Sequence, residues 1–142
     1  MRATAHNQKT IEEFQAKKGK GVGMWGDHVL LMTAKGAKSG DAITTPLVFG
    51  RDGRDYVIVA SKGGAPDHPS WFRNLKANPE VEVQVGDGEK IHTMKARARP
   101  LESGPERDRL YQQMAKIWPP YLDYQKRTER KIPVVKLEPI SL

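Results

Sequence analysis

The sequence predicts a mainly β domain with flanking helices, arranged as a closed or split β-barrel. Six apolar or alternating stretches have the length of strands, and most of them follow one another in meander order. Closing such a meander into a barrel removes the unpaired strand edges that an open sheet would leave. At 142 residues the chain has the length of one ordinary domain, so we expect a single domain over residues 1–142.

A helix followed by a linker is expected over residues 1–22. The helical periodicity covers residues 8–18, within which Thr10 and Glu13 have the spacing of a capping box. The glycine-rich stretch GKGVG that follows ends this helix.

Three strands are expected in the rest of the first half, over residues 27–34, 43–50 and 56–61. An Asp-Gly pair, typical of a hairpin, lies between the second and the third, so we expect these two strands to pair antiparallel. Pro46 has no N–H to donate to a neighbouring strand, which places the second strand at a sheet edge or at a bulge.

The second half of the chain predicts helices and strands in alternation. Ser103 and Glu106 have capping-box spacing, and a Pro-Pro pair separates the last two helices. The expected helices cover residues 68–77, 104–117 and 121–129, and the expected strands cover residues 80–85, 90–100 and 132–139.

The composition argues against several classes of site. Cysteine is absent, which excludes disulfides and thiolate metal sites, and the four histidines lie far apart, so we expect no metal. The net charge of +7 favours anionic ligands, but basic and acidic residues are mixed, so we expect no nucleic-acid partner. The first residues lack the apolar core of a signal peptide, and no apolar run is long enough to span a membrane, so we expect a cytoplasmic protein.

No nucleophile motif, phosphate-loop motif or carboxylate pair appears, so an enzyme with this sequence would depend on a cofactor. Two loops combine lysine with glycine beside predicted strands. The stretch TAKGAKSGDAITTPLVFG, residues 33–50, offers Lys38 and Ser39 in a loop that suits a phosphate as well as an ordinary solvated turn. The stretch ASKGGAPDHPSWFRNL, residues 60–75, sets Lys62 near two adjacent aromatics, which suits a flat anionic ligand.

Three aromatic residues near the C-terminus recur every three positions. Trp118, Tyr121 and Tyr124 therefore share one face of a helix or turn. Two interpretations remain open for them, because the same spacing fits core packing and fits a lid over a planar ligand.

In this order, the stretches resemble the deazaflavin (F420)-dependent nitroreductase family. The specific parts are ASKGGAPDHPSWFRNLKANP, the TAKGAKSG loop with its following TPL, PPYLDYQ and the closing IPVVKLEP. These proteins are F420H2-dependent reductases of the split β-barrel group related to pyridoxamine-phosphate oxidase, a fold also typical of FMN-binding proteins. The resemblance therefore implies this fold, coenzyme F420 as cofactor and a deazaflavin-binding domain over the whole chain.

The resemblance also implies the position of each site residue. Ser61, Lys62 and Gly63 would lie along the deazaflavin ring, and Lys38 and Ser39 would hold the phosphate of its tail. The full implied cofactor set is Ala37, Lys38, Ser39, Ile43, Thr44, Thr45, Pro46, Leu47, Val48, Val59, Ala60, Ser61, Lys62, Gly63, Ser70, Trp71 and Asn74. The implied acceptor contacts are Val48, Ser61, Trp118, Tyr121 and Tyr124, with catalytic roles for Tyr121, Tyr124 and Ser61.

The chain departs from the family pattern in the tail-binding loop. Ala37 and Ile43 stand where the family has arginines, and neither residue can replace a guanidinium. Either the tail binds more weakly, or Lys35, Arg73 and Lys76 compensate.

The implied function is hydride transfer from reduced deazaflavin to small electron-poor acceptors, namely quinones, enones, unsaturated lactones such as coumarins, and nitroaromatics. Two alternatives share the fold: an F420 carrier without turnover, and an FMN-dependent oxidoreductase. We also expect a weak peripheral membrane contact through the N-terminal helix. The choice between monomer and dimer stays open.

Overall fold

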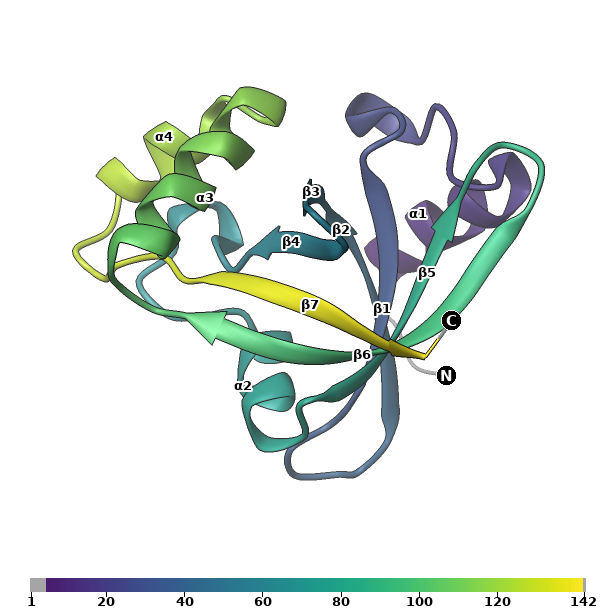
Figure 1. Cartoon of the computed structure of the whole chain (residues 1–142), viewed down its shortest axis with the longest axis horizontal. Coiled ribbons are helices and arrows are strands. Elements are labelled where there is room, and N and C mark those ends of the chain that lie inside the picture. The colour runs from purple at the N-terminus through teal and green to yellow at the C-terminus, as the bar shows by residue number, and fades with distance from the viewer. Residues whose placement is uncertain (1–4, 142) are drawn as a thin grey trace.

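Seven antiparallel strands form one sheet in residues 5–141, the part of the chain described by this computed structural model (Figure 1). Their order in the sheet is β2-β1-β5-β6-β7-β4-β3. The strands are β1 (Val29–Lys35), β2 (Ala42–Val48), β3 (Gly50–Asp52), β4 (Asp55–Val59), β5 (Glu80–Gly86), β6 (Ile91–Leu101) and β7 (Val134–Ser141).

Helices cover both outer sides of this sheet and one end of its interior (Figure 1). The helices are α1 (Ala5–Lys17), α2 (Ser70–Ala77), α3 (Pro105–Ile117) and α4 (Pro120–Lys126), and two short 3₁₀ turns are η1 (Gly23–Trp25) and η2 (Lys62–Gly64). Strong curvature brings β2 into contact with β4, although these two strands do not pair as neighbours in the sheet. The barrel is therefore split between β2 and β4.

Three apolar clusters hold the layers together. The barrel interior contains Leu30, Met32 and Ile58 and is filled from one end by Phe72 of α2, all of them fully or almost fully buried. A second cluster packs α3 and α4 against the outer face of β4 and β7, and a third packs α1 against β1. Burial of this apolar surface is the main force that fixes each helix in place.

The pairing of the second expected strand was predicted wrongly. We expected residues 43–50 to pair with the next strand, but β2 pairs along its whole length with β1. The short strand β3 pairs with β4 instead, around a turn at Gly53. The Asp-Gly pair does mark a hairpin, but this hairpin joins β3 to β4. β3 has only three residues, too few for an alternating pattern to be recognised in the sequence. The edge position predicted from Pro46 is confirmed, because β2 ends the sheet.

Both predicted capping boxes are wrong. Helix α1 begins at Ala5, which puts Thr10 in its middle, and Glu13 accepts hydrogen bonds from Lys17 and from the amide of Gly23. Helix α3 is capped by Gly104 without any side-chain hydrogen bond. Glu106 is drawn away from the helix end because Arg99 and Lys136 offer it ion pairs.

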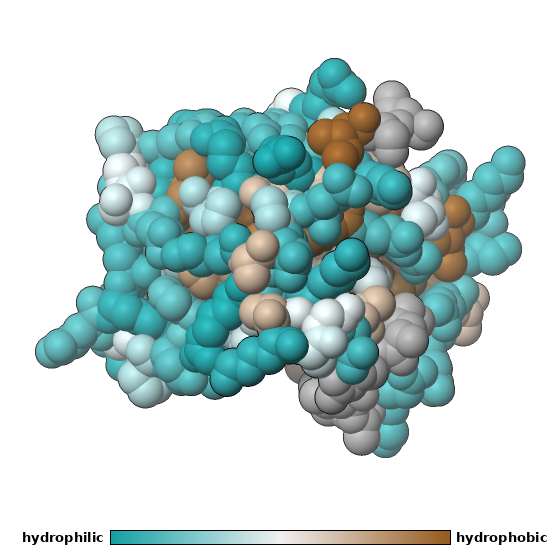
Figure 2. All heavy atoms as spheres, turned by 90° about the horizontal axis from the view of Figure 1, so that it is seen from below, coloured by the Kyte–Doolittle hydropathy of each residue, from teal (hydrophilic) through white to brown (hydrophobic). Residues whose placement is uncertain are grey.

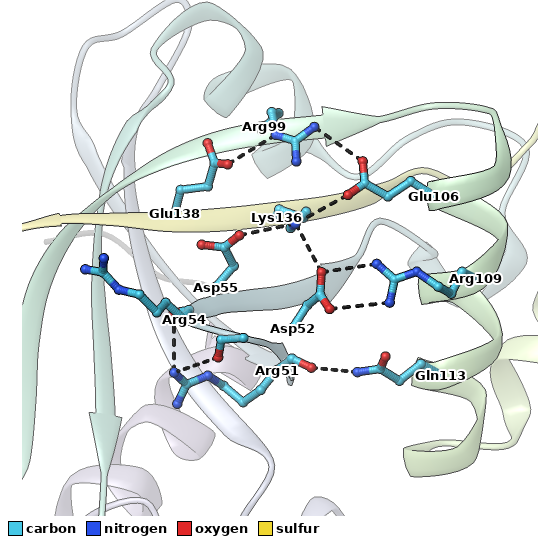
Figure 3. Close-up of polar contacts among 11 residues, drawn as sticks. Arg51, Asp52, Arg54, Asp55, Arg99, Glu106, Arg109, Gln113, Lys136 and Glu138 are labelled. Atoms are coloured by element: carbon cyan, nitrogen blue, oxygen red, sulfur yellow. Dashed lines mark hydrogen bonds and ion pairs between the residues drawn. The ribbon is translucent and has the colours of Figure 1, made fainter.

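A buried lysine of β7, Lys136, joins α3 to the β3–β4 hairpin through ion pairs (Figure 3). The Lys136 side chain is only 9% exposed, and its Nζ lies 3.1 Å from Asp52, 3.2 Å from Asp55 and 3.4 Å from Glu106. Arg109 of α3 also reaches Asp52, at 3.2 Å. Removing one charge from such a network lowers the stability of the fold, because it leaves a buried charge unpaired. It therefore fixes α3, and α4 after it, relative to the sheet.

One face of the molecule shows no broad apolar area. The face shown in Figure 2 is mostly hydrophilic, with hydrophobic side chains in small separate places. Among the described residues, none of the helices has both the length and the apolar character that crossing a bilayer requires.

Candidate active site

A pocket of about 410 Å³ opens between the split edge of the barrel and the helices around it. Its walls come from β2, the end of β4, the η2 turn, the start of α2, and α4, with α1 and η1 on the remaining side. The lining residues are Asn7, Thr10, Trp25, Val29, Thr45, Pro46, Leu47, Val48, Val59, Ser61, Lys62, Gly63, Pro69, Trp71, Trp118, Tyr121 and Tyr124. A cavity of this size and mixed lining is typical of a small-molecule site.

The pocket brings together most of the residues singled out in the sequence. Stretches that lie up to about eighty positions apart meet here, because β2 and β4 face each other across the split. The predicted residues in the wall are Thr45, Pro46, Leu47, Val48, Val59, Ser61, Lys62, Gly63, Trp71, Trp118, Tyr121 and Tyr124.

The η2 turn has an unusual backbone. Lys62, Gly63 and Gly64 all have positive φ, at 47°, 63° and 84°. Gly64 allows α4 to approach closely, since a Cβ at this position would lie 2.6 Å from the carbonyl oxygen of Tyr124. The Lys62 side chain is half-exposed and pairs with Asp67 at 3.1 Å. The turn thus presents mainly its backbone to the pocket.

The C-terminal aromatics pack and line the pocket at once. Tyr121 is 5% exposed and belongs to the cluster under α3, yet it forms part of the pocket wall. Its hydroxyl has no hydrogen bond to any described residue, and burial raises the pKa of this phenol, so it stays protonated at neutral pH. The Tyr124 hydroxyl accepts the indole N–H of Trp118 at 3.4 Å. Core packing is therefore confirmed for Tyr121, and all three aromatic residues line the pocket, while their role as a lid over a planar ligand stays a prediction.

The predicted tail-binding residues lie outside the pocket, in the loop from Gly36 to Asp41. Asn74 of α2 accepts the backbone N–H of Ala37 at 2.9 Å and so ties this loop to the helix whose first turn carries Trp71. Lys38 is exposed, and within residues 5–141 it has no ion pair or hydrogen bond. The loop therefore carries a cation without a partner among the described residues.

The remaining predicted residues are not part of the pocket lining. Thr44 is 1% exposed, with its hydroxyl 2.7 Å from that of Thr33, and Ala60 is fully buried in the barrel. Ser39 is in the loop, where its hydroxyl accepts the N–H of Asp41. Ile43 and Ser70 do not belong to the lining.

Sequence reasoning missed five lining residues and one residue behind the wall. Asn7, Thr10, Trp25, Val29 and Pro69 line the pocket. Trp25 was detectable as an aromatic residue between glycines, and its ring lies 6.4 Å from that of Trp118. Arg130, behind the η2 turn, gave no signal, because its role depends on carbonyl groups seventy positions away.

The lysine of the loop supplies a first prediction. Lys38→Ala is expected to raise the dissociation constant of F420 about ten- to a hundredfold, the effect of losing one charge-assisted hydrogen bond. Quenching of tryptophan fluorescence during titration measures it. Lys90→Ala, an exposed lysine on the β5–β6 turn, makes the same change in net charge and should leave the constant unaltered. Equal constants for wild type and Lys38→Ala would place the anionic tail elsewhere.

Comparisons with known proteins point to one family. Residues 4–139 match the family described as F420H(2)-dependent quinone reductase. An F420H(2)-dependent quinone reductase of Mycobacterium tuberculosis is 44% identical over 110 residues, which are 76% of this chain and 71% of the relative.

Two solved structures agree with this assignment. One, described as an F420-H2 dependent reductase, has 44% identity and a TM-score of 0.69, covering 78% of this chain and 94% of its own. Another, described as a domain-swapped dimer, has 39% identity and a TM-score of 0.70, covering 92% and 95%. The split barrel, the pocket and these matches lead to one conclusion: the chain belongs to the F420H(2)-dependent quinone reductase family.

Proposed function

We propose that the protein transfers a hydride from reduced coenzyme F420 to quinones and to other electron-poor acceptors, namely enones, coumarin-type lactones and nitroaromatics. The observation that carries the proposal is the pocket itself, in which the η2 turn and the aromatic residues Trp118, Tyr121 and Tyr124 face one cavity. A reductase of this kind needs cofactor and acceptor side by side, and a single cavity between two such walls meets that need.

The residues present fit a flat ring that carries an anionic tail. The backbone amides of Ser61 and Lys62 have no hydrogen-bond partner in the described part of the chain, so they are available to oxygen atoms of a ring. Lys35 and Lys38 are exposed and have no ion pair with any described residue. Of the residues expected to compensate for Ala37 and Ile43, Lys35 is therefore the most available, since Arg73 is paired with Asp67 and Lys76 with Glu102.

Coenzyme F420 supplies the hydride when bound, and the chain provides the environment for the transfer. Trp71 and Trp118 give the pocket aromatic walls that limit water. The N–H groups of Ser61 and Lys62 would hold the ring by hydrogen bonds to its oxygen atoms and would stabilise negative charge there. Tyr121 keeps its proton because of burial, so its Oη can donate a hydrogen bond to an acceptor oxygen.

Phenylalanine variants of Tyr121 and Tyr124 distinguish a packing role from a direct role in the reaction. Tyr121→Phe is expected to keep the melting temperature, because its hydroxyl has no hydrogen bond to any described residue. Tyr124→Phe removes the acceptor of the Trp118 indole N–H and should lower the melting temperature only slightly, because Trp118 is partly exposed. Turnover of an enone or quinone should fall by roughly tenfold, the effect of one hydrogen bond lost in the transition state, while F420 affinity stays constant. Tyr56→Phe, a buried tyrosine outside this pocket, is the control. A lower melting temperature with normal turnover would assign both tyrosines to packing alone.

Turnover by the purified protein tests the proposed function. F420H2 oxidation is followed by absorbance, with menadione, an enone, coumarin and a nitroaromatic offered as acceptors in turn. We expect oxidation that depends on both protein and acceptor, fastest with the quinone. Tight binding of F420H2 with no acceptor-dependent oxidation would instead make the protein a carrier.

We also propose that the N-terminal segment makes a weak membrane contact through its charged side chains and not through apolar ones. Ile11 and Phe14 of α1 are fully buried against the barrel, so they have no apolar surface to insert. Lys17, Lys18 and Lys20 at the end of the helix are exposed. The protein should co-sediment with anionic vesicles and be released by salt, and equal binding to neutral vesicles would contradict this proposal.

A further inference from the structure

Arg130 lies behind the η2 turn and is hydrogen-bonded to the backbone that forms it. Its guanidinium donates to the carbonyl oxygens of Ser61 at 2.8 Å, Ala65 at 2.8 Å and Ala60 at 3.2 Å. A fourth contact joins it to Nδ1 of His68 at 3.0 Å. We propose that Arg130 is the positioning residue that aims the amides of Ser61 and Lys62 into the pocket, where they bind an oxygen of the deazaflavin ring. This inference rests on the proposed function.

The direction of the amides follows from the planarity of the peptide bond. In a trans peptide the N–H of one residue points opposite to the C=O of the residue before it, and the described chain contains only trans peptides. Holding the carbonyls of Ala60 and Ser61 on the Arg130 side therefore turns the N–H groups of Ser61 and Lys62 the other way. Arg130 is not part of the lining, whereas Ser61 and Lys62 are, so these two amides face the pocket.

Two backbone hydrogen bonds close this turn, from Gly64 to Ser61 and from Ala65 to Lys62, but its backbone is strained. Lys62 has a φ of 47°, in a region that costs a residue with a side chain of the order of 1 kcal/mol or more, and two glycines with positive φ follow it. Three hydrogen bonds from one rigid guanidinium over-determine the conformation. Arg130 has no ion pair with any described residue, so its charge acts on these peptide groups and strengthens their N–H groups as donors.

Arg130 is itself held by a second arginine through a glutamine. The Gln125 amide donates to the carbonyl oxygen of Arg130 at 2.9 Å. The oxygen of the same amide accepts Nη2 of Arg107 at 2.7 Å and the N–H of Ile132 at 2.9 Å. Arg107 is 6% exposed and also donates twice to the carbonyl oxygen of Ile132. This chain of contacts fixes the segment between α4 and β7, and with it the guanidinium.

Substitution of Arg130 tests the inference on binding rather than on turnover. Arg130→Lys keeps a charge but cannot reach several carbonyls at once, so the dissociation constant of F420 should rise at least tenfold by tryptophan fluorescence. Free ethylguanidinium added to Arg130→Ala should restore most of the lost affinity. Amide hydrogen exchange gives a second readout: F420 should protect the N–H groups of Ser61 and Lys62 in the wild type and much less in Arg130→Lys.

A destabilising control separates positioning from general destabilisation. Val83→Ala removes part of a fully buried side chain of β5, which is not in the pocket lining, and should leave F420 affinity unchanged while both variants are folded. Wild-type affinity in Arg130→Lys, or unprotected Ser61 and Lys62 amides in the wild-type complex, would overturn the inference. Failure of the wild type to bind F420 would instead contradict the proposed function, so the two failures are distinguishable.

Discussion

A Gly64→Ala variant is expected to lose most of its turnover and a large part of its stability. The new Cβ would lie 2.6 Å from the carbonyl oxygen and 3.0 Å from the Cα of Tyr124, so η2 and α4 must move apart. Positive φ costs an alanine about 1–2 kcal/mol, and the steric overlap adds a further ~1–3 kcal/mol in the free energy of unfolding. This movement changes the relative positions of Lys62 and Tyr124, which both line the pocket. Urea denaturation and steady-state kinetics measure both effects.

Gly63→Ala is the matched control. Gly63 also has positive φ, at 63°, but no atom outside its neighbours lies within 4 Å of the Cβ position. It should pay only the conformational cost of about 1–2 kcal/mol and keep most of its turnover. Similar losses in the two variants would show that the approach of α4 to η2 does not matter for the site.

Replacing Lys136 by alanine should lower the free energy of unfolding by about 3 kcal/mol, the lower end of the range for breaking a buried ion pair, because its carboxylate partners are partly exposed. Asp52 keeps Arg109 and Glu106 keeps Arg99, but Asp55 is left without an ion pair to any described residue. Lys95→Ala, which breaks an exposed pair with Glu80, is the control and should cost under ~1 kcal/mol. Equal losses would show that the network contributes nothing beyond a surface pair.

The same network predicts how stability depends on pH. Hydrogen bonds from Arg109 and then from Lys136 hold the pKa of Asp52 below its usual range. Its stabilising contribution is therefore complete above the pKa of the unfolded chain, about 3.9, and is lost as the pH falls toward the lower folded value. Lys136→Ala should lose less stability than the wild type between neutral pH and pH 3.

Local patterns predicted the elements well, because alternation and helical spacing are properties of neighbouring residues. The expected strands 80–85 and 90–100 became β5 and β6, and the helix ended by Asn78 and Pro79 became α2. The errors lie where a distant group decided the outcome. Glu106 forms an ion pair with Lys136, thirty positions away, instead of capping its helix. β2 pairs with β1 and not with the strand that follows it across the Asp-Gly turn.

In the candidate site, too, local patterns predicted some residues, and distant contacts determined the others. Motifs located the η2 turn and the aromatic residues of α4, because unusual composition marks them in the sequence. The positions of Trp25 and Arg130 depend on the tertiary fold. The ring of Trp25 lies near that of Trp118, and Arg130 donates hydrogen bonds to carbonyl groups about seventy positions earlier in the chain. An arginine that bonds to backbone leaves no pattern of spacing to recognise.

Titration of the protein with F420, FMN and FAD tests the central claim most directly. Quenching of Trp25, Trp71 and Trp118, which all line the pocket, reports binding for each ligand under identical conditions. We expect the lowest dissociation constant for F420, with an affinity that falls as salt rises, because Lys35 and Lys38 offer free charges to its long anionic tail. Equal or tighter binding of FMN would contradict the proposal that this pocket is built for a deazaflavin.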